Sequence, residues 1–168
     1  QKLAGYSGEV DDLARATAHF EKSLLFAESM PHEFWTEFGN ANQKLSEMVQ
    51  DIRPVIKSIT CYKQAISLCL SSFEGWLGLA RSLKKLYHFS YESDHYSQAC
   101  DCFAAASQLK PDVAEVWLER IEFIIEASRR KKESAKLRVA IEKCEQAAIL
   151  FAPPLKTISL EDLKTSVD

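Results

Sequence analysis

Two histidines and two cysteines near the middle of the chain are the residues most easily taken for a metal site. His88 and His95 precede Cys100 and Cys102, and imidazole and thiolate ligands suit zinc. Two residues that are two positions apart on a helix point about 200° away from each other, so these thiols cannot chelate one ion together. We therefore expect no metal site, with Cys100 packed inside and Cys102 on another face.

Motifs of the common enzyme classes are absent from the sequence. It contains no P-loop, GxGxxG, HExxH, CxxC pair or GxSxG element. The acidic residues fall at helical spacing on expected solvent faces, whereas a catalytic carboxylate pair needs a closed site that shifts its pKa values. We therefore expect no enzymatic activity, no catalytic residues and no cofactor.

A basic run, Arg129-Arg130-Lys131-Lys132, could contact an acidic partner or nucleic acid. Such runs are more often solvated turns, and they also suit the C-terminus of a helix. The net charge is −3 and the isoelectric point is near 5.9, so the sequence carries no global basic field. The longest apolar runs, such as residues 147–152, are far shorter than the ~20 residues that span a bilayer. We expect neither a nucleic-acid partner nor membrane insertion.

Cysteine usage and the first residue bear on compartment and context. The chain has five cysteines, an odd number, and shows no secretory signal, so a disulfide framework is not expected. We expect a reducing, cytoplasmic compartment. Because the chain begins with Gln1, we also expect a processed chain or an excised segment that belongs to a larger protein or complex.

An internal repeat organises most of the sequence. Three tryptophans, Trp35, Trp76 and Trp117, are spaced by 41 and 41 residues. The same shift aligns Ser58 with Ala99 and Ala140, Tyr62 with Phe103 and Cys144, Ala65 with Ala106 and Ala147, and Leu70 with Pro111 and Ala152. Because these columns share one register, coincidence is a poor explanation, and a repeat architecture is indicated.

Each repeat contains two apolar helical patterns, and one such pair of helices cannot bury its own apolar face. Ser71-Ser72 separates the first two repeats, and Pro111, which cannot continue a helix, separates the next two. Five glycines and five prolines are too few for a many-stranded β protein. We expect one all-α solenoid over residues 1–168, with a lone helix at 9–29, repeats at 32–70, 73–110 and 114–152, and a capping segment at 155–168.

The columns resemble the tetratricopeptide repeat (TPR) family, whose pattern has Trp, Leu-Gly and Tyr in a first helix and Ala, Phe, Ala and Pro in a second. The second repeat matches best, through Trp76, Leu79-Ala80, Ala99, Phe103, Ala106 and Pro111. The resemblance implies antiparallel helix pairs stacked into a right-handed solenoid. It does not extend to the period, because the TPR unit has 34 residues and this one has 41.

The seven extra residues fall between the two helices of each repeat, and they amount to about two helical turns. We expect each helix to be longer by about one turn, with short connections, so that residues 85–91 are not an open loop. Ile121 is large where Gly39 and Ala80 are small, and Cys144 is small where Tyr62 and Phe103 are large. We interpret this as a volume exchange between two facing positions.

The resemblance implies that the first helix of each repeat lines a concave groove. The groove candidates, placed from each Trp, are Glu33, Thr36, Asn40, Gln43, Lys44, Glu74, Leu77, Arg81, Lys84, Lys85, Glu115, Leu118, Glu122, Ile125 and Glu126. The second repeat contributes cations to this set and the third contributes carboxylates. Leu77, Leu118 and Ile125 would serve as apolar anchors. Taken one by one, most of these residues could equally be the wet face of amphipathic helices.

These features favour a non-enzymatic protein-interaction module that holds a peptide or helix of a partner protein along the groove, as an adaptor, scaffold or co-chaperone. A partner with an acidic stretch, then a basic one, and aliphatic side chains would fit. Glu115 and Glu119 would repel a C-terminal carboxylate, so clients of the chaperone carboxylate-clamp type are not expected. The alternatives are a bacterial secretion chaperone of TPR type and an architectural subunit of an obligate assembly.

Overall fold

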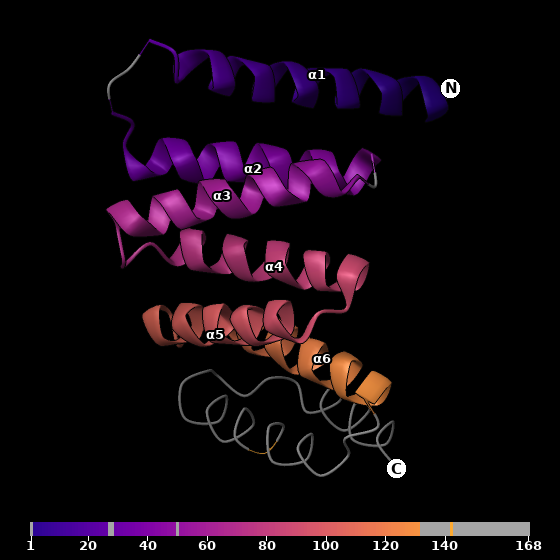
Figure 1. Ribbon diagram of the computed structural model, residues 1–168, viewed down its shortest axis with the longest axis vertical. Coiled ribbons are helices and arrows are strands. Elements are labelled where there is room, and N and C mark those ends of the chain that lie inside the picture. Colours follow the sequence, from indigo (N-terminus) through magenta and orange to yellow (C-terminus); the bar gives the residue numbers. More distant parts are fainter. Residues whose placement is uncertain (1, 27–28, 50, 132–141, 143–168) are drawn as a thin grey trace. The chain divides into compact units, whose positions relative to one another are not determined.

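The structure is a computed structural model that describes residues 2–26, 29–49, 51–131 and 142 (Figure 1). Over these residues the chain forms helices and no strand, so the all-α class is confirmed for the part described. The helices are α1 (Lys2–Ser23), α2 (His32–Val49), α3 (Ile52–Leu68), α4 (Phe73–Ser90), α5 (Ser93–Leu109) and α6 (Ala114–Lys131). The chain divides into two compact units, residues 1–102 and 103–168, and each is described by itself below.

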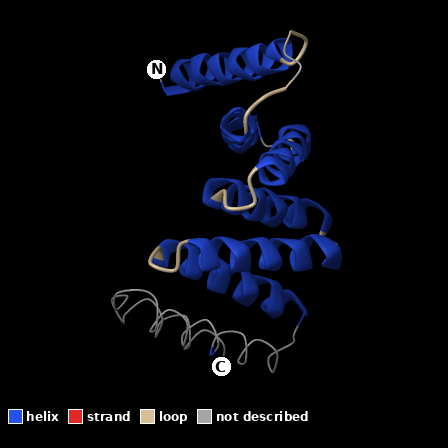
Figure 2. Cartoon of the chain, turned by 90° about the vertical axis from the view of Figure 1, so that its left-hand side faces the viewer, coloured by secondary structure: helices blue, strands red, loops and turns tan. Residues whose placement is uncertain are grey.

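The helices of the first two repeats are long and their connections are short, as expected from the seven extra residues. Helices α2 and α3 have 18 and 17 residues, and α4 and α5 also have 18 and 17. Helix α4 continues to Ser90, and Tyr91 closes it in the left-handed conformation, with φ 55°. Figure 2 shows the short tan connections between the blue helices.

Two expected boundaries differ from the structure or lie beyond it. The first helix begins at Lys2 rather than at residue 9, and it ends at Ser23, well before residue 29. Its early part lacks a marked apolar stripe, which is why periodicity placed its start too late. The second helix of the third repeat and the capping segment at 155–168 lie outside the described residues.

Short polar side chains set the start of two helices. The Asp51 carboxylate caps α3 by accepting a hydrogen bond from the backbone N–H of Arg53 at 2.9 Å. The Ser72 hydroxyl caps α4 by accepting one from the backbone N–H of Gly75 at 3.1 Å. Such caps satisfy N–H groups that have no partner inside the helix, so the chain begins a new helix after each short connection.

The tryptophans of the second and third repeats make the same contact within their own units. The indole Nε1 of Trp76 donates to the carbonyl of Leu70 at 2.8 Å, and that of Trp117 donates to the carbonyl of Pro111 at 3.1 Å. The donor and the acceptor of the second hydrogen bond each lie 41 residues after those of the first. Each indole therefore ties the start of a first helix to the connection that precedes it, and the sequence repeat corresponds to a repeated contact.

The small and aromatic columns of the repeat are core positions. Ser58, Tyr62 and Ala65 of the first repeat are fully buried, and so are their counterparts Ala99, Phe103 and Ala106 in the second. Small residues allow helices to approach closely, and the aromatic residue fills the space that remains. Equal burial at equivalent positions explains why these columns are the ones that the repeat retains.

Tyr62 is the central packing element of the first unit, in which α2 packs against α3, α3 against α4, and α2 also touches α4. Its ring lies between two glycines. A Cβ placed on Gly39 of α2 would come within 2.7 Å of the Tyr62 ring, and one placed on Gly78 of α4 within 2.3 Å. Both distances are too short for any side chain, so only glycine fits on each side of the ring.

The Gly39 contact bears on the volume exchange expected from the sequence. Gly39 faces Tyr62, so a small residue does oppose a large one in the first repeat. In the third repeat, Ile121 is buried in α6, whereas Cys144 lies outside the described residues. The exchange in the third repeat therefore stays a prediction.

Helix α1 joins the first unit through aromatic packing and one ion pair. The ring of Phe20 stacks on Phe38 with 5.1 Å between centroids and meets Phe34 edge-on at 5.2 Å. Lys57 of α3 forms an ion pair with Glu21 of α1. Both contacts involve the C-terminal half of α1, so this half packs against the rest of the unit.

Replacing Gly78 with alanine tests the clamp around Tyr62. We expect Gly78→Ala to lower the free energy of unfolding by about 1–3 kcal/mol, because the added methyl group meets a buried ring. The matched control is Gly8→Ala in α1, where a Cβ would have no neighbour within 4 Å. This control should gain up to about 1 kcal/mol from helix propensity. Urea unfolding measures both, and a Gly78→Ala protein as stable as the wild type would contradict the clamp.

Candidate functional site

The hydroxyl of Tyr62, a fully buried residue of α3, contacts two side-chain amides of α2. It lies 2.7 Å from the Asn40 Oδ1 atom and 2.9 Å from the Gln43 Oε1 atom. A phenol has one proton to donate, so only one of the two amide oxygens receives it at a time. Burial of the ring raises the pKa of Tyr62, and the positive charge of Arg81 nearby opposes this effect. The hydroxyl therefore stays protonated and donates to one of the two α2 amides at a time.

A lysine of α4 continues this row of polar groups. The Lys85 ammonium donates to the hydroxyl of Ser46 in α2 at 2.9 Å. Partial burial lowers the pKa of Lys85, whereas the carboxylate of Glu47 raises it. No carboxylate of the described residues lies within ion-pair distance of this ammonium. A cation that is partly desolvated and held by a neutral hydroxyl retains capacity for an anionic partner.

We call this row the α2/α4 polar face. It consists of Asn40, Gln43, Ser46, Tyr62, Arg81 and Lys85. Four of these residues are among the groove candidates derived from the sequence, and the structure of the first unit brings them together from α2 and α4. Sequence reasoning missed Ser46 and Tyr62. Tyr62 had been recognised only as a core position, and although the whole residue is buried, its hydroxyl contacts the amide oxygens of Asn40 and Gln43.

The groove candidates as a whole are spread over several environments. Glu33, Asn40, Lys44, Glu74, Glu115 and Glu122 are exposed, and Gln43, Arg81, Lys84, Lys85, Leu118 and Glu126 are partly buried. Glu115, Leu118, Glu122, Ile125 and Glu126 belong to the second unit. The polar face is therefore built from residues of the first unit alone.

Three candidates are not surface residues, which corrects the expected stripe. Thr36, Leu77 and Ile125 are buried. Thr36 uses its hydroxyl inside its own helix, where it donates to the carbonyl of His32 at 3.0 Å. Leu77 and Ile125 were expected as anchors for a partner, but both belong to the core. The residue after each Trp lies beside the face that packs against neighbouring helices. The predicted stripe of groove candidates therefore includes positions at the edge of the core.

The expected orientation of the two neighbouring cysteines is also wrong. Cys102 is buried, whereas Cys100 is only partly buried. The repeat itself carried the signal, because Cys102 lies 41 residues after Cys61, which is buried as well. His95 makes a hydrogen bond through Nδ1 with the Ser90 hydroxyl at 2.9 Å. Within the described ranges, no three histidine, cysteine or acidic residues are placed to hold a metal ion.

Burial makes two thiols poor nucleophiles. It raises the pKa of Cys61 from an ordinary value of 9.0 to about 12 and that of Cys102 to about 11. The thiolate is the reactive form of cysteine, so both residues behave as small apolar core groups.

Comparison with known proteins adds no name to this site. No family model and no curated protein matches the chain. None of the described helices is long and apolar enough to cross a membrane. The chemistry of the α2/α4 polar face is therefore the basis on which a function is proposed.

The shared hydrogen bond of Tyr62 can be tested by removing its partners one at a time. Tyr62→Phe should lower the free energy of unfolding by about 1 kcal/mol, because the amide oxygens lose their buried donor. Asn40→Ala and Gln43→Ala should each cost less, since one acceptor remains for the hydroxyl. The double variant should lose more than the sum of the two single losses. Strictly additive losses in urea unfolding would show that the acceptors do not substitute for each other.

Thiol labelling tests the burial of the two cysteines. At pH 8 we expect iodoacetamide to modify Cys61 and Cys102 at least about a hundred times more slowly in the native protein than in urea, because their thiolate fractions fall with the raised pKa. Peptide mapping by mass spectrometry identifies each modified site. Cys69, which is partly buried, provides the internal comparison. Equal labelling rates for native and unfolded protein at Cys61 would contradict its assignment to the core.

Proposed function

We propose that this chain is a TPR-like helical repeat module without enzymatic activity, which binds a segment of a partner protein along the α2/α4 polar face. Stacking of its helix pairs into a right-handed solenoid is part of this proposal. Support comes from the tryptophan contact that recurs after 41 residues and from the fully buried columns in the first two repeats. These features are typical of repeat proteins, in which each unit contacts its neighbours.

The observation that carries the binding function is the preorganised polar row on α2 and α4. Tyr62 is fully buried, and its hydroxyl donates to the amide of Asn40 or of Gln43 before any partner arrives. Preorganised groups lose less side-chain entropy when they bind, so more of the interaction energy contributes to affinity. Side-chain amides can also pair with the backbone of an extended segment of any sequence.

Charge indicates the chemistry of the partner segment. Arg81, Lys84 and Lys85 place three cations on α4, whereas α2 carries Glu37 and Glu47. A segment that presents acidic side chains to α4 would complement this arrangement. Because Leu77 is buried, the face lacks the aliphatic anchor that the sequence had suggested. Polar contacts contribute more to specificity and association rate than to affinity, so we expect binding in the micromolar range.

A peptide selection tests this function with a random library in place of a named partner. The protein selects from peptides displayed on phage, and the enriched peptides are synthesised and measured by fluorescence anisotropy. We expect acidic peptides that bind the wild type with micromolar affinity. Arg81→Glu combined with Lys84→Glu should weaken binding at least about tenfold, because two attractions become repulsions.

The matched control reverses two exposed lysines away from this face, Lys22 in α1 and Lys63 in α3, and so changes the net charge equally. Lys22→Glu with Lys63→Glu should leave the affinity unchanged. Equal weakening by both double variants would reduce the effect to overall charge. Failure to select any peptide, or selected peptides that ignore both variants, would contradict binding at this face.

An architectural role is the second candidate, and exposed apolar residues favour it. Ile56 and Leu68 of α3 are each about half exposed, and Leu70 after α3 is 73% exposed. Exposed apolar side chains such as these are often covered in an assembly. Size-exclusion chromatography with light scattering decides between the two roles. A stable oligomer that dissociates in Leu68→Ser/Leu70→Ser, but not in Arg81→Glu/Lys84→Glu, would favour the architectural role.

A further inference from the structure

The connection between α4 and α5 is short and strained. Two residues, Tyr91 and Glu92, join the helices, and both belong to the first unit. Tyr91 has φ 55° and ψ 22°, which lies in the left-handed region, where the Cβ of an L residue crowds the backbone. Over the part of the chain that the structure describes, no other non-glycine residue has a positive φ. A bulky residue is an outlier in this region, so the closed connection costs free energy.

The sequence around this connection is compatible with a continuous helix. Between Gly78 and Pro111 the chain contains neither glycine nor proline. If Tyr91 and Glu92 took helical dihedral angles, residues 73–109 would form one helix and the strain at Tyr91 would be relieved. The first backbone N–H groups of α5, which have no carbonyl partner inside that helix, would then bond to the last carbonyls of α4.

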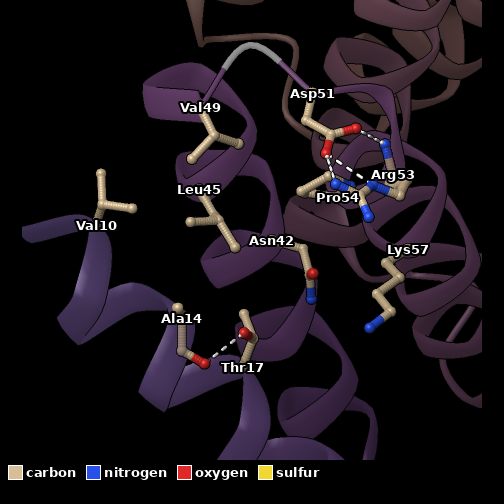
Figure 3. A pocket seen from close by; sticks show the side chains of 10 residues that line it. All are labelled: Val10, Ala14, Thr17, Asn42, Leu45, Val49, Asp51, Arg53, Pro54 and Lys57. Carbon is tan, nitrogen blue, oxygen red and sulfur yellow. Dashed lines mark hydrogen bonds and ion pairs between the residues drawn. The ribbon is translucent and has the colours of Figure 1, made fainter.

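Other connections of the chain do not permit such a merger. At the start of α3, the Asp51 side chain caps the helix and Pro54 lies in its first turn, as Figure 3 shows. A proline inside a continuous helix would remove a hydrogen bond and clash with the preceding turn. Pro111 has the same effect between α5 and α6. The α3–α4 connection is four residues long and ends in the Ser72 cap. The α4–α5 connection is therefore the place where two helices merge most easily.

Side-chain contacts across the connection hold the hairpin closed. The Tyr87 ring meets that of Tyr91 edge-on with 5.8 Å between centroids, and it lies 5.9 Å from that of Tyr96. The Ser90 hydroxyl and His95 Nδ1 are 2.9 Å apart. In a straight helix, Tyr87 and Tyr96 would be separated by about 13 Å along the axis. Their contact would then be possible only between two chains.

We infer that the α4–α5 connection is a hinge through which two copies of this chain exchange their C-terminal parts. In the exchanged dimer, α4 and α5 form one helix in each copy, and residues 93–102 of one copy lie beside Tyr87 of the other. Ala99 and Cys102 are buried in the single chain and stay buried, because the first unit that receives them is identical. Contacts away from the hinge are thus kept, whereas the strain at Tyr91 is removed twice. Short strained hinges favour this type of exchange.

Apolar surface at the hinge favours a second copy as the partner. Phe89 is 46% exposed and Tyr91 is 49% exposed. In a reciprocal exchange the two hinge segments pass beside each other, and the contact between them is new to the dimer. Rings that the single chain leaves in water are available to that contact, and covering them is favourable. The inference does not depend on the proposed function at the α2/α4 polar face.

Two substitutions at one position test the hinge. The full-length protein is refolded from urea at increasing concentration, and monomer and dimer are measured by size-exclusion chromatography with light scattering. Tyr91→Gly and Tyr91→Ala both remove the ring. Glycine relieves the closed hinge and disfavours the straight helix, whereas alanine does the opposite. We expect Tyr91→Gly to dimerise with an association constant at least about tenfold lower than Tyr91→Ala, because each dimer contains two hinges.

Hydrogen exchange of the separated species distinguishes exchanged parts from simple side-by-side contact. We expect the backbone amides of residues 92–95 to exchange at least about tenfold more slowly in the dimer, because carbonyls of α4 now accept their hydrogen bonds. Leu68→Ser/Leu70→Ser, which alters exposed residues at the end of α3, should leave this dimer intact. The inference would be overturned by the absence of a dimer at the highest soluble concentration, by equal association of the two Tyr91 variants, by unchanged exchange at residues 92–95, or by loss of the dimer in Leu68→Ser/Leu70→Ser.

Discussion

The first unit depends on one interaction, the insertion of the Tyr62 ring between Gly39 and Gly78. The ring is fully buried. A side chain at Gly39 would keep α2 away from the ring, and one at Gly78 would keep α4 away. Close approach of α2 and α4 to α3 is what makes the remaining contacts possible, including the buried hydrogen bond between the hydroxyls of Ser58 and Ser82 at 2.9 Å. Packing in protein interiors leaves few voids, so the fit of one large ring against two absent side chains sets the spacing of three helices.

The same ring connects the core to the surface. Its apolar body fills the space between the helices, while its hydroxyl reaches Asn40 and Gln43 on the α2/α4 polar face. Tyrosine suits this position because it has an apolar ring and a polar tip. Phe103, the equivalent residue of the second repeat, has no hydroxyl, although it is buried to the same degree. The hydroxyl that contacts Asn40 and Gln43 is thus particular to the first repeat, added to a core position that both repeats share.

Much of the fold could be predicted because the 41-residue register constrains it repeatedly. Helix lengths, short connections and buried columns follow from a pattern that several positions carry together. Features that occur once were harder to predict. Gly78 belongs to none of the repeat columns that the sequence revealed, and the weak early pattern of α1 concealed its true start. The burial of Cys102 was predictable from Cys61, but local spacing on one helix was given more weight than the register. Whether a side chain at the edge of a packed face is buried, as Leu77 is, depends on a small rotation of the helix about its axis. The spacing of apolar residues in the sequence does not resolve such a rotation.

The burial of Leu77 changes what the polar face can contribute to binding. Apolar anchors in desolvated pockets supply most of the energy in typical interfaces, and rim charges supply little. In the proposed function, a face without such an anchor would select its partner through complementary charge and hydrogen bonds. Lys85 fits this account, because the protein has partly removed its water and offers it the Ser46 hydroxyl and the more distant charge of Glu47 in return.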